Sequence, residues 1–178
     1  TIPLTASETD TQAVLTFTSQ SYLAGIALTY TAPEEEFPGT PENVAAEDVT
    51  YAFTSLDGLT DATGATPADG TLEGEKGQYQ DMKVDATAGK FYVQPEQSRV
   101  QVNAGTVLYL PAAYDEQGAV LLISGTQDGS TPANIRVNGE SQTTNQPISL
   151  DMSDSSAYPQ YVQVEFDTIA YVTSISLN

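Results

Sequence analysis

The side chains best suited to bind a sugar gather between residues 79 and 101. Sugars are bound when their apolar faces stack on aromatic rings and planar polar groups hydrogen-bond their hydroxyls. Tyrosines and glutamines occur together in this stretch, with three of the five basic residues of the chain. We predict six ligand-contacting residues, which are Tyr79, Lys83, Lys90, Tyr92, Arg99 and Gln101. Two other tyrosines are expected to be structural: Tyr109 because its strand is apolar, and Tyr171 as a core or corner residue.

The basic residues stand out because the chain is strongly acidic. It has 178 residues, with 24 acids against five bases and a net charge of −19. All five bases lie between residues 76 and 136. The simplest interpretation of Lys83, Lys90 and Arg99 is surface ion pairing, with Asp81, Asp85 or Glu96 as partners. Such pairs contribute at most about 1 kcal/mol, so they would explain the positions of the bases without giving them a function.

The same composition argues against several kinds of partner and chemistry. Strong acidity repels nucleic acid and anionic membranes, and no apolar run reaches the roughly 18 residues of a membrane span. The chain has no histidine and no cysteine, which excludes Ser-His-Asp and thiol mechanisms. A glycosidase needs only two carboxylates, but no pair is singled out. We predict a protein that is not an enzyme.

A metal site is the remaining chemical option. Asp57, Asp61 and Asp69 lie in the glycine-rich stretch LDGLTDATGATPADG, and Ca²⁺ favours oxygen ligands from turns. Their spacing does not match an EF-hand, and loop aspartates commonly stabilise turns. We predict no cofactor, with Ca²⁺ as the alternative at these three aspartates.

Alternating apolar and polar residues predict an all-β fold. RVQV (99–102) and VQVEF (162–166) alternate, and TVLYL (106–110) is rich in strand-forming residues. Asn138-Gly139 is a strong hairpin signal, for which ISL (148–150) is the candidate partner strand. No segment shows a convincing helical period, so we expect an antiparallel β-sandwich.

An internal repeat suggests how the chain is organised. Residues 13–29 align without gaps on residues 162–178, with four identities that include Tyr22 and Tyr171. We therefore predict that residues 1–31 are the closing strands of a preceding sister module, forming an extra N-terminal β-hairpin. Residues 32–48, rich in proline and acids, are then a linker, and residues 49–178 are a nearly complete module. Because no signal peptide is visible, the chain is expected to be a mature fragment or an internal piece of a longer protein.

Residues 49–178 resemble the non-catalytic β-sandwich modules that accompany bacterial pectate lyases and pectinesterases. The motifs that carry the resemblance are TYAF (50–53), EKGQY (75–79), KVDATAGKF (83–91), VQVNAGT (100–106), RVNG (136–139) and YVTSISL (171–177). The resemblance covers about 130 of the 178 residues. Such modules often carry a tryptophan before the Q-x-N run, where this chain has Arg99-Val100 and no tryptophan anywhere.

The resemblance implies a jelly-roll-like sandwich that binds a plant polysaccharide, pectic or neutral, in a secreted or cell-surface bacterial protein. A galacturonate polymer would be repelled by so acidic a chain unless bases met its carboxylates, and arginine can do so through two hydrogen bonds. Neutral glucans would need no bases. The expected partners are a poly- or oligosaccharide and neighbouring modules of the same polypeptide. The alternative is a structural spacer or adhesin repeat without a sugar site.

Overall fold

The computed structural model describes residues 37–41, 44 and 48–178. The chain divides into two compact units, Thr1–Glu34 and Glu35–Asn178, and every described residue belongs to the second. The predicted N-terminal hairpin and sister module (1–31) therefore lie outside the described residues and stay predictions. The division between the units falls within the segment predicted as a linker.

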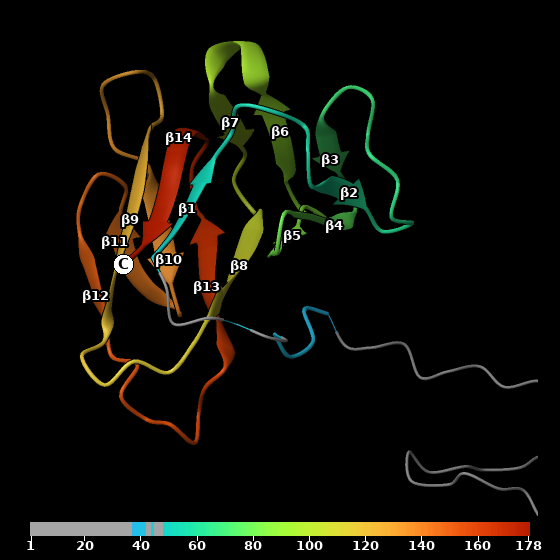
Figure 1. The fold of residues 1–178 in the computed structure, drawn as a ribbon. Coiled ribbons are helices and arrows are strands. Elements are labelled where there is room, and N and C mark those ends of the chain that lie inside the picture. The colour runs from blue at the N-terminus through green and yellow to red at the C-terminus, as the bar shows by residue number, and fades with distance from the viewer. Residues whose placement is uncertain (1–36, 42–43, 45–47) are drawn as a thin grey trace, which may run out of the picture. The chain divides into compact units, whose positions relative to one another are not determined.

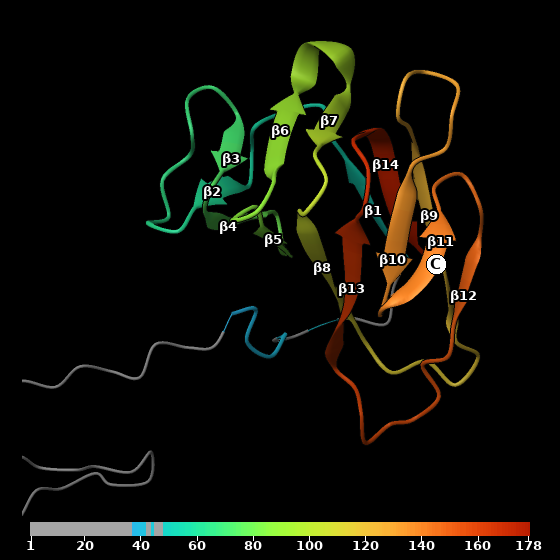
Figure 2. The same cartoon turned by 180° about the vertical axis from the view of Figure 1, so that it is seen from behind.

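The second unit consists of two seven-stranded antiparallel sheets that face each other (Figures 1 and 2). Sheet A contains β1 (Val49–Ala52), β3 (Thr71–Glu73), β6 (Lys90–Gln94), β7 (Arg99–Val102), β9 (Ala119–Thr126), β12 (Ile148–Leu150) and β14 (Ala170–Leu177), in the order β12-β9-β14-β7-β6-β3 with β1 also paired to β14. Sheet B contains β2 (Leu59–Asp61), β4 (Lys76–Tyr79), β5 (Met82–Asp85), β8 (Val107–Ala112), β10 (Asn134–Val137), β11 (Glu140–Thr143) and β13 (Gln160–Phe166), in the order β11-β10-β13-β8-β5-β4-β2.

The predicted antiparallel β-sandwich is confirmed. The chain crosses repeatedly from one sheet to the other, for example between β5 and β6 and between β7 and β8, as in jelly-roll-like folds. A short 3₁₀ turn, η1 (Pro95–Gln97), joins β6 to β7. Within the described part of the chain, no helix is long and apolar enough to cross a membrane.

Side-chain alternation decides which residues enter the core. In β13, Val162, Val164 and Phe166 are buried, whereas the residues between them reach the outer face of sheet B. This is the two-residue period of a pleated strand that has one face on a core. The largest buried side chains include a cluster of aromatic rings, in which Phe53 lies 5.2 Å from Tyr79 and 6.1 Å from Phe91 between ring centroids.

The Asn138-Gly139 hairpin forms as predicted, but with a different partner strand. Both residues have positive φ, 47° and 85°, as a tight two-residue turn between paired strands requires. The turn joins β10 to the strand that follows it directly, β11. The predicted partner ISL (148–150) is β12, which pairs with β9 in the other sheet. The prediction was wrong because a two-residue turn brings the next residues into register first.

Candidate functional site

The six predicted site residues lie in three different places. Lys90 and Tyr92 on β6 and Arg99 and Gln101 on β7 occupy the outer face of sheet A, where these two strands are neighbours. The other two lie apart from them. Lys83 is on the outer face of sheet B, where its Nζ donates a hydrogen bond to Gln78 Oε1 at 2.8 Å. Tyr79 points into the core.

Tyr79 has no surface on which a sugar could stack. Its side chain is 1% exposed, and its hydroxyl donates to the backbone oxygens of Ala52 and Ser55 at 2.9 and 3.2 Å. Burial, together with the charge of Asp57, raises the pKa of this phenol, which keeps it a donor. Its assignment to a ligand site is corrected accordingly. The strand that contains Tyr79, KGQY (76–79), does not alternate apolar and polar residues, so the sequence did not indicate that the ring faces the core.

A row of three side chains crosses the outer face of sheet A. Tyr92 on β6 lies opposite Gln101 on β7, and Gln101 lies opposite Tyr171 on β14. All three are half-buried. Because adjacent strands are about 4.8 Å apart, the backbones of the two tyrosines lie roughly 10 Å apart with an amide between them. The Gln101 Nε2 donates to Asn103 Oδ1 at 2.9 Å, which fixes the orientation of that amide.

Tyr171, expected from the sequence to be a core or corner residue, is half-buried on the outer face of sheet A. Its neighbours Ala170 and Val172 are both fully buried, so the alternation of β14 directs Tyr171 outward. The signal was present in the sequence as the local pattern A-Y-V. The resemblance of Tyr171 to Tyr22 in the repeat obscured it.

Arg99 is held in place by neutral neighbours. The guanidinium carbon lies 4.3 Å from the centroid of the Tyr171 ring, and Nε donates to Gln94 Oε1 on the adjacent strand at 2.7 Å. The ion pairs formed within the described part of the chain involve Lys90 and Arg136, and none involves Arg99. The guanidinium is therefore oriented by stacking and by one hydrogen bond. Neither of its two terminal nitrogens forms an ion pair with a carboxylate in the described part of the chain.

Lys90 differs from Arg99 because a carboxylate neutralises it. Its Nζ lies 3.0 Å from Glu73 Oε2 on β3 and 5.8 Å from the centroid of the Tyr92 ring. The ion pair predicted for this lysine is present, although its partner is Glu73 and not one of the three acids named from the sequence.

Charge is distributed very differently over the two sheets. The strands of sheet A contain only three charged residues, which are Glu73, Lys90 and Arg99. The strands of sheet B contain Asp61, Lys76, Lys83, Asp85, Arg136, Glu140 and Glu165. With two cations and one anion, sheet A is slightly positive in a chain whose net charge is −19.

Two of the three aspartates considered for Ca²⁺, Asp61 and Asp69, stabilise turns through their carboxylates. The Asp61 carboxylate accepts from the backbone nitrogens of Thr63 and Ala65 at 2.8 and 3.0 Å. A hydrogen bond from the Thr63 hydroxyl is the main cause of the lowered pKa of Asp61. Asp69 accepts from the backbone nitrogen of Thr71. Among the residues that the structure describes, no three acidic side chains come together as a metal site.

Fold and surface together define an antiparallel two-sheet sandwich with an aromatic and amide-bearing face. Comparisons of the chain with protein-family models, with curated proteins and with solved structures find no match.

Proposed function

We propose that residues 49–178 form a non-catalytic carbohydrate-binding module that binds a uronate-bearing polysaccharide on the outer face of sheet A. The observation that carries the proposal is Arg99, a guanidinium stacked on Tyr171 and not paired with any described carboxylate. In a chain with 24 acids and five bases, an arginine that no described acid pairs with, on a sheet whose strands contain one acid, is suited to meet an external anion.

The chemistry of the neighbouring side chains favours a sugar as the carrier of that anion. Tyr92 offers a partly exposed ring for the apolar face of a pyranose, Tyr171 supports the stacked Arg99 guanidinium, and Gln101 offers an amide between the two tyrosines. A guanidinium binds a carboxylate through two parallel hydrogen bonds, which an ammonium group cannot reproduce. A galacturonate chain presents both features, sugar rings and carboxylates.

Binding without catalysis is the role that this arrangement supports. The face is a sheet surface whose strands contain one carboxylate, and Lys90 already neutralises that carboxylate. Acid–base hydrolysis of a glycosidic bond needs two carboxylates. A polysaccharide ligand implies a secreted or cell-surface protein, in which this module would hold a larger polypeptide on its substrate.

The test is affinity electrophoresis of the full chain in gels containing polygalacturonate or the same polymer fully methyl-esterified. Esterification removes the carboxylate charge and leaves the sugar backbone. We expect retardation by polygalacturonate, weakened by added salt, and much less by the ester. Arg99→Gln should weaken binding about 10- to 150-fold, since hydrogen bonds to charged groups contribute about 1.5–3 kcal/mol. Arg99→Lys should restore it only in part.

Lys83→Gln is the matched control because it removes the same charge from the opposite sheet. It should change the affinity by less than about twofold, a difference of well under 1 kcal/mol. Equal effects of Lys83→Gln and Arg99→Gln would show that only net charge matters and would contradict the proposal. Absence of retardation by polygalacturonate would favour a structural spacer or adhesin repeat.

A further inference from the structure

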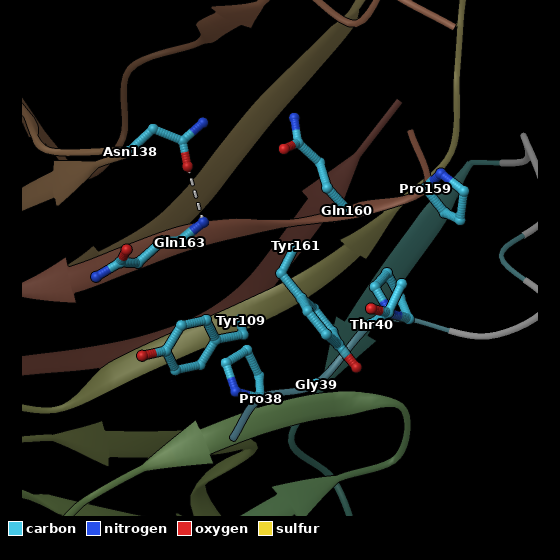
Figure 3. A pocket seen from close by; sticks show the side chains of 10 residues that line it. Pro38, Gly39, Thr40, Tyr109, Asn138, Pro159, Gln160, Tyr161 and Gln163 are labelled. Carbon is cyan, nitrogen blue, oxygen red and sulfur yellow. Dashed lines mark hydrogen bonds between the residues drawn. The ribbon is translucent and has the colours of Figure 1, made fainter. Parts of the chain in front are cut away.

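We propose that the domain has a second binding site, a pocket on the outer face of sheet B that takes an uncharged sugar. The pocket has a volume of about 430 Å³ and opens over β8 and β13 (Figure 3). Its size lies near the small end of the usual range for ligand sites, about 300–1,000 Å³. None of its ten lining residues is charged, although the chain contains 24 acidic and five basic residues.

Two tyrosines form the aromatic part of the pocket. Tyr109 on β8 and Tyr161 on β13 point outward because the residues that alternate with them, such as Leu108, Leu110 and Val162, fill the core. Their ring centroids lie 6.2 Å apart, with the ring planes at 78°. One ring can therefore lie under a sugar while the other stands beside it. The sequence predicted a structural role for Tyr109, and its ring packs against that of Tyr161 on the outer face of the sheet.

The segment before β1 completes the pocket. Phe37 packs edge-on against Tyr109, with centroids 5.7 Å apart, and Lys76 Nζ lies 4.9 Å from the centroid of the Phe37 ring. Behind Phe37, residues 38–41 form one wall of the pocket (Figure 3). Part of the segment predicted as a linker thus lies against the sheet, and Tyr109 is fixed between Phe37 and Tyr161.

The polar groups of the pocket are neutral donors and acceptors. Gln160, Gln163 and Asn138 contribute three primary amides. The Asn138 Oδ1 accepts from the backbone nitrogen of Gln163 at 2.9 Å, which leaves the amide nitrogen available to a ligand (Figure 3). Tyrosine hydroxyls are protonated at neutral pH, and burial, the main cause, raises the pKa of both Tyr109 and Tyr161 further.

This set of groups matches a sugar better than an ion or a peptide. An ion would need at least one charged partner in the lining. A proline-rich peptide also docks on aromatic rings, but its backbone offers chiefly carbonyl acceptors, whereas each amide here offers a donor and an acceptor. Sugar hydroxyls both donate and accept, and the faces of Tyr109 and Tyr161 suit the apolar side of a pyranose.

The pocket is separate from the face proposed for uronates. The two surfaces belong to different sheets. One has an arginine that no described carboxylate pairs with, whereas the ten residues that line the pocket are uncharged. A module with both sites would bind a polymer, or two polymers, through acidic and neutral segments at once. Linked sites of this kind raise the overall affinity above that of either one.

The test uses the full chain in gels containing soluble galactomannan, xyloglucan or starch, with polygalacturonate run in parallel. We expect retardation by at least one neutral polymer, unaffected by salt. Tyr161→Ala should weaken it at least about tenfold through the loss of a stacking ring. Gln160→Ala, at an exposed position whose truncation leaves the core intact, should weaken it in the same gels. The matched control is Tyr114→Ala, because Tyr114 is 41% exposed and lies outside the pocket.

The outcomes separate the two sites. Loss of neutral-polymer binding in Tyr161→Ala and Gln160→Ala, with polygalacturonate binding retained, supports the pocket. The inference is overturned if no neutral polymer retards the protein, or if both pocket variants bind as tightly as the parent chain. It is also overturned if poly-L-proline binds in a Tyr161-dependent way while the sugars do not. Arg99→Gln is informative only in the polygalacturonate gel, so failure of one proposal leaves the other standing.

Discussion

Replacing Thr106 with valine should destabilise the domain although it changes the side-chain volume very little. Thr106 is fully buried, and its hydroxyl lies just before β8. Its Oγ1 accepts from the Lys90 backbone nitrogen at 2.9 Å and donates to the Lys90 backbone oxygen at 3.1 Å. One hydroxyl therefore links the start of a sheet B strand to the start of β6 in sheet A.

The expected magnitude follows from which groups lose their partner. The Lys90 carbonyl oxygen also accepts from the Asn103 backbone nitrogen at 2.9 Å, so it stays satisfied in Thr106→Val. The Lys90 N–H loses the hydroxyl oxygen that accepts from it. A buried donor without a partner costs about 1–3 kcal/mol. For a domain of this size each kcal/mol lowers Tm by about 2–4 °C.

The assay is urea unfolding followed by far-UV circular dichroism, with thermal unfolding alongside. We expect a lower denaturation midpoint and an unchanged m-value, because the folded domain buries the same surface. Thr63→Val is the control: its hydroxyl bonds Asp61 Oδ1 at 2.7 Å on the exposed surface, where the cost should stay within about 0.5 kcal/mol. If Thr106→Val cost no more than Thr63→Val, the hydroxyl bridge between the sheets would have no energetic weight.

Two further predictions concern a close packing contact and an acidic turn. Gly77→Ala should destabilise the domain by about 1–3 kcal/mol, because a Cβ there would collide with the Thr60 carbonyl oxygen and come within 2.7 Å of Leu72 Cδ1; a denaturation midpoint equal to that of the parent chain would show that the strands shift apart freely. Asp128 accepts hydrogen bonds from the backbone nitrogens of Thr131 and Ser130, which lower its pKa. Its contribution to stability is therefore present above the unfolded pKa of about 3.9 and is lost as pH falls through the lower folded value. A ¹³C NMR titration should find Asp128 ionised where ordinary aspartates are half protonated, and a midpoint at or above 3.9 would refute this.

Local patterns predicted individual strands well. RVQV forms β7 with the predicted bounds, and VQVEF lies within β13. Asn138-Gly139 adopts the positive φ angles expected of its turn. These features depend on the backbone of a few consecutive residues, which is why a short stretch of sequence suffices to predict them.

The grouping of the site residues could not be predicted in the same way. Lys83 and Lys90 are close in sequence, but the chain crosses between the sheets after β5, so they end on opposite faces of the domain. Tyr171, far along the chain, lies beside Arg99 because β14 pairs with β7. Tyr79 and Tyr92 look alike in sequence, yet only Tyr92 reaches the surface.

The all-β class, the apolar–polar alternation of several strands and the strong acidity of the chain follow from the sequence. The neighbours of each strand, and with them the Tyr92–Gln101–Tyr171 row and the pocket beside Tyr109 and Tyr161, become known only from the folded domain. Alternation along a strand arises from the local pleat of the backbone. Strand pairing instead depends on the burial of distant apolar faces against one another, and no short stretch of sequence contains that information.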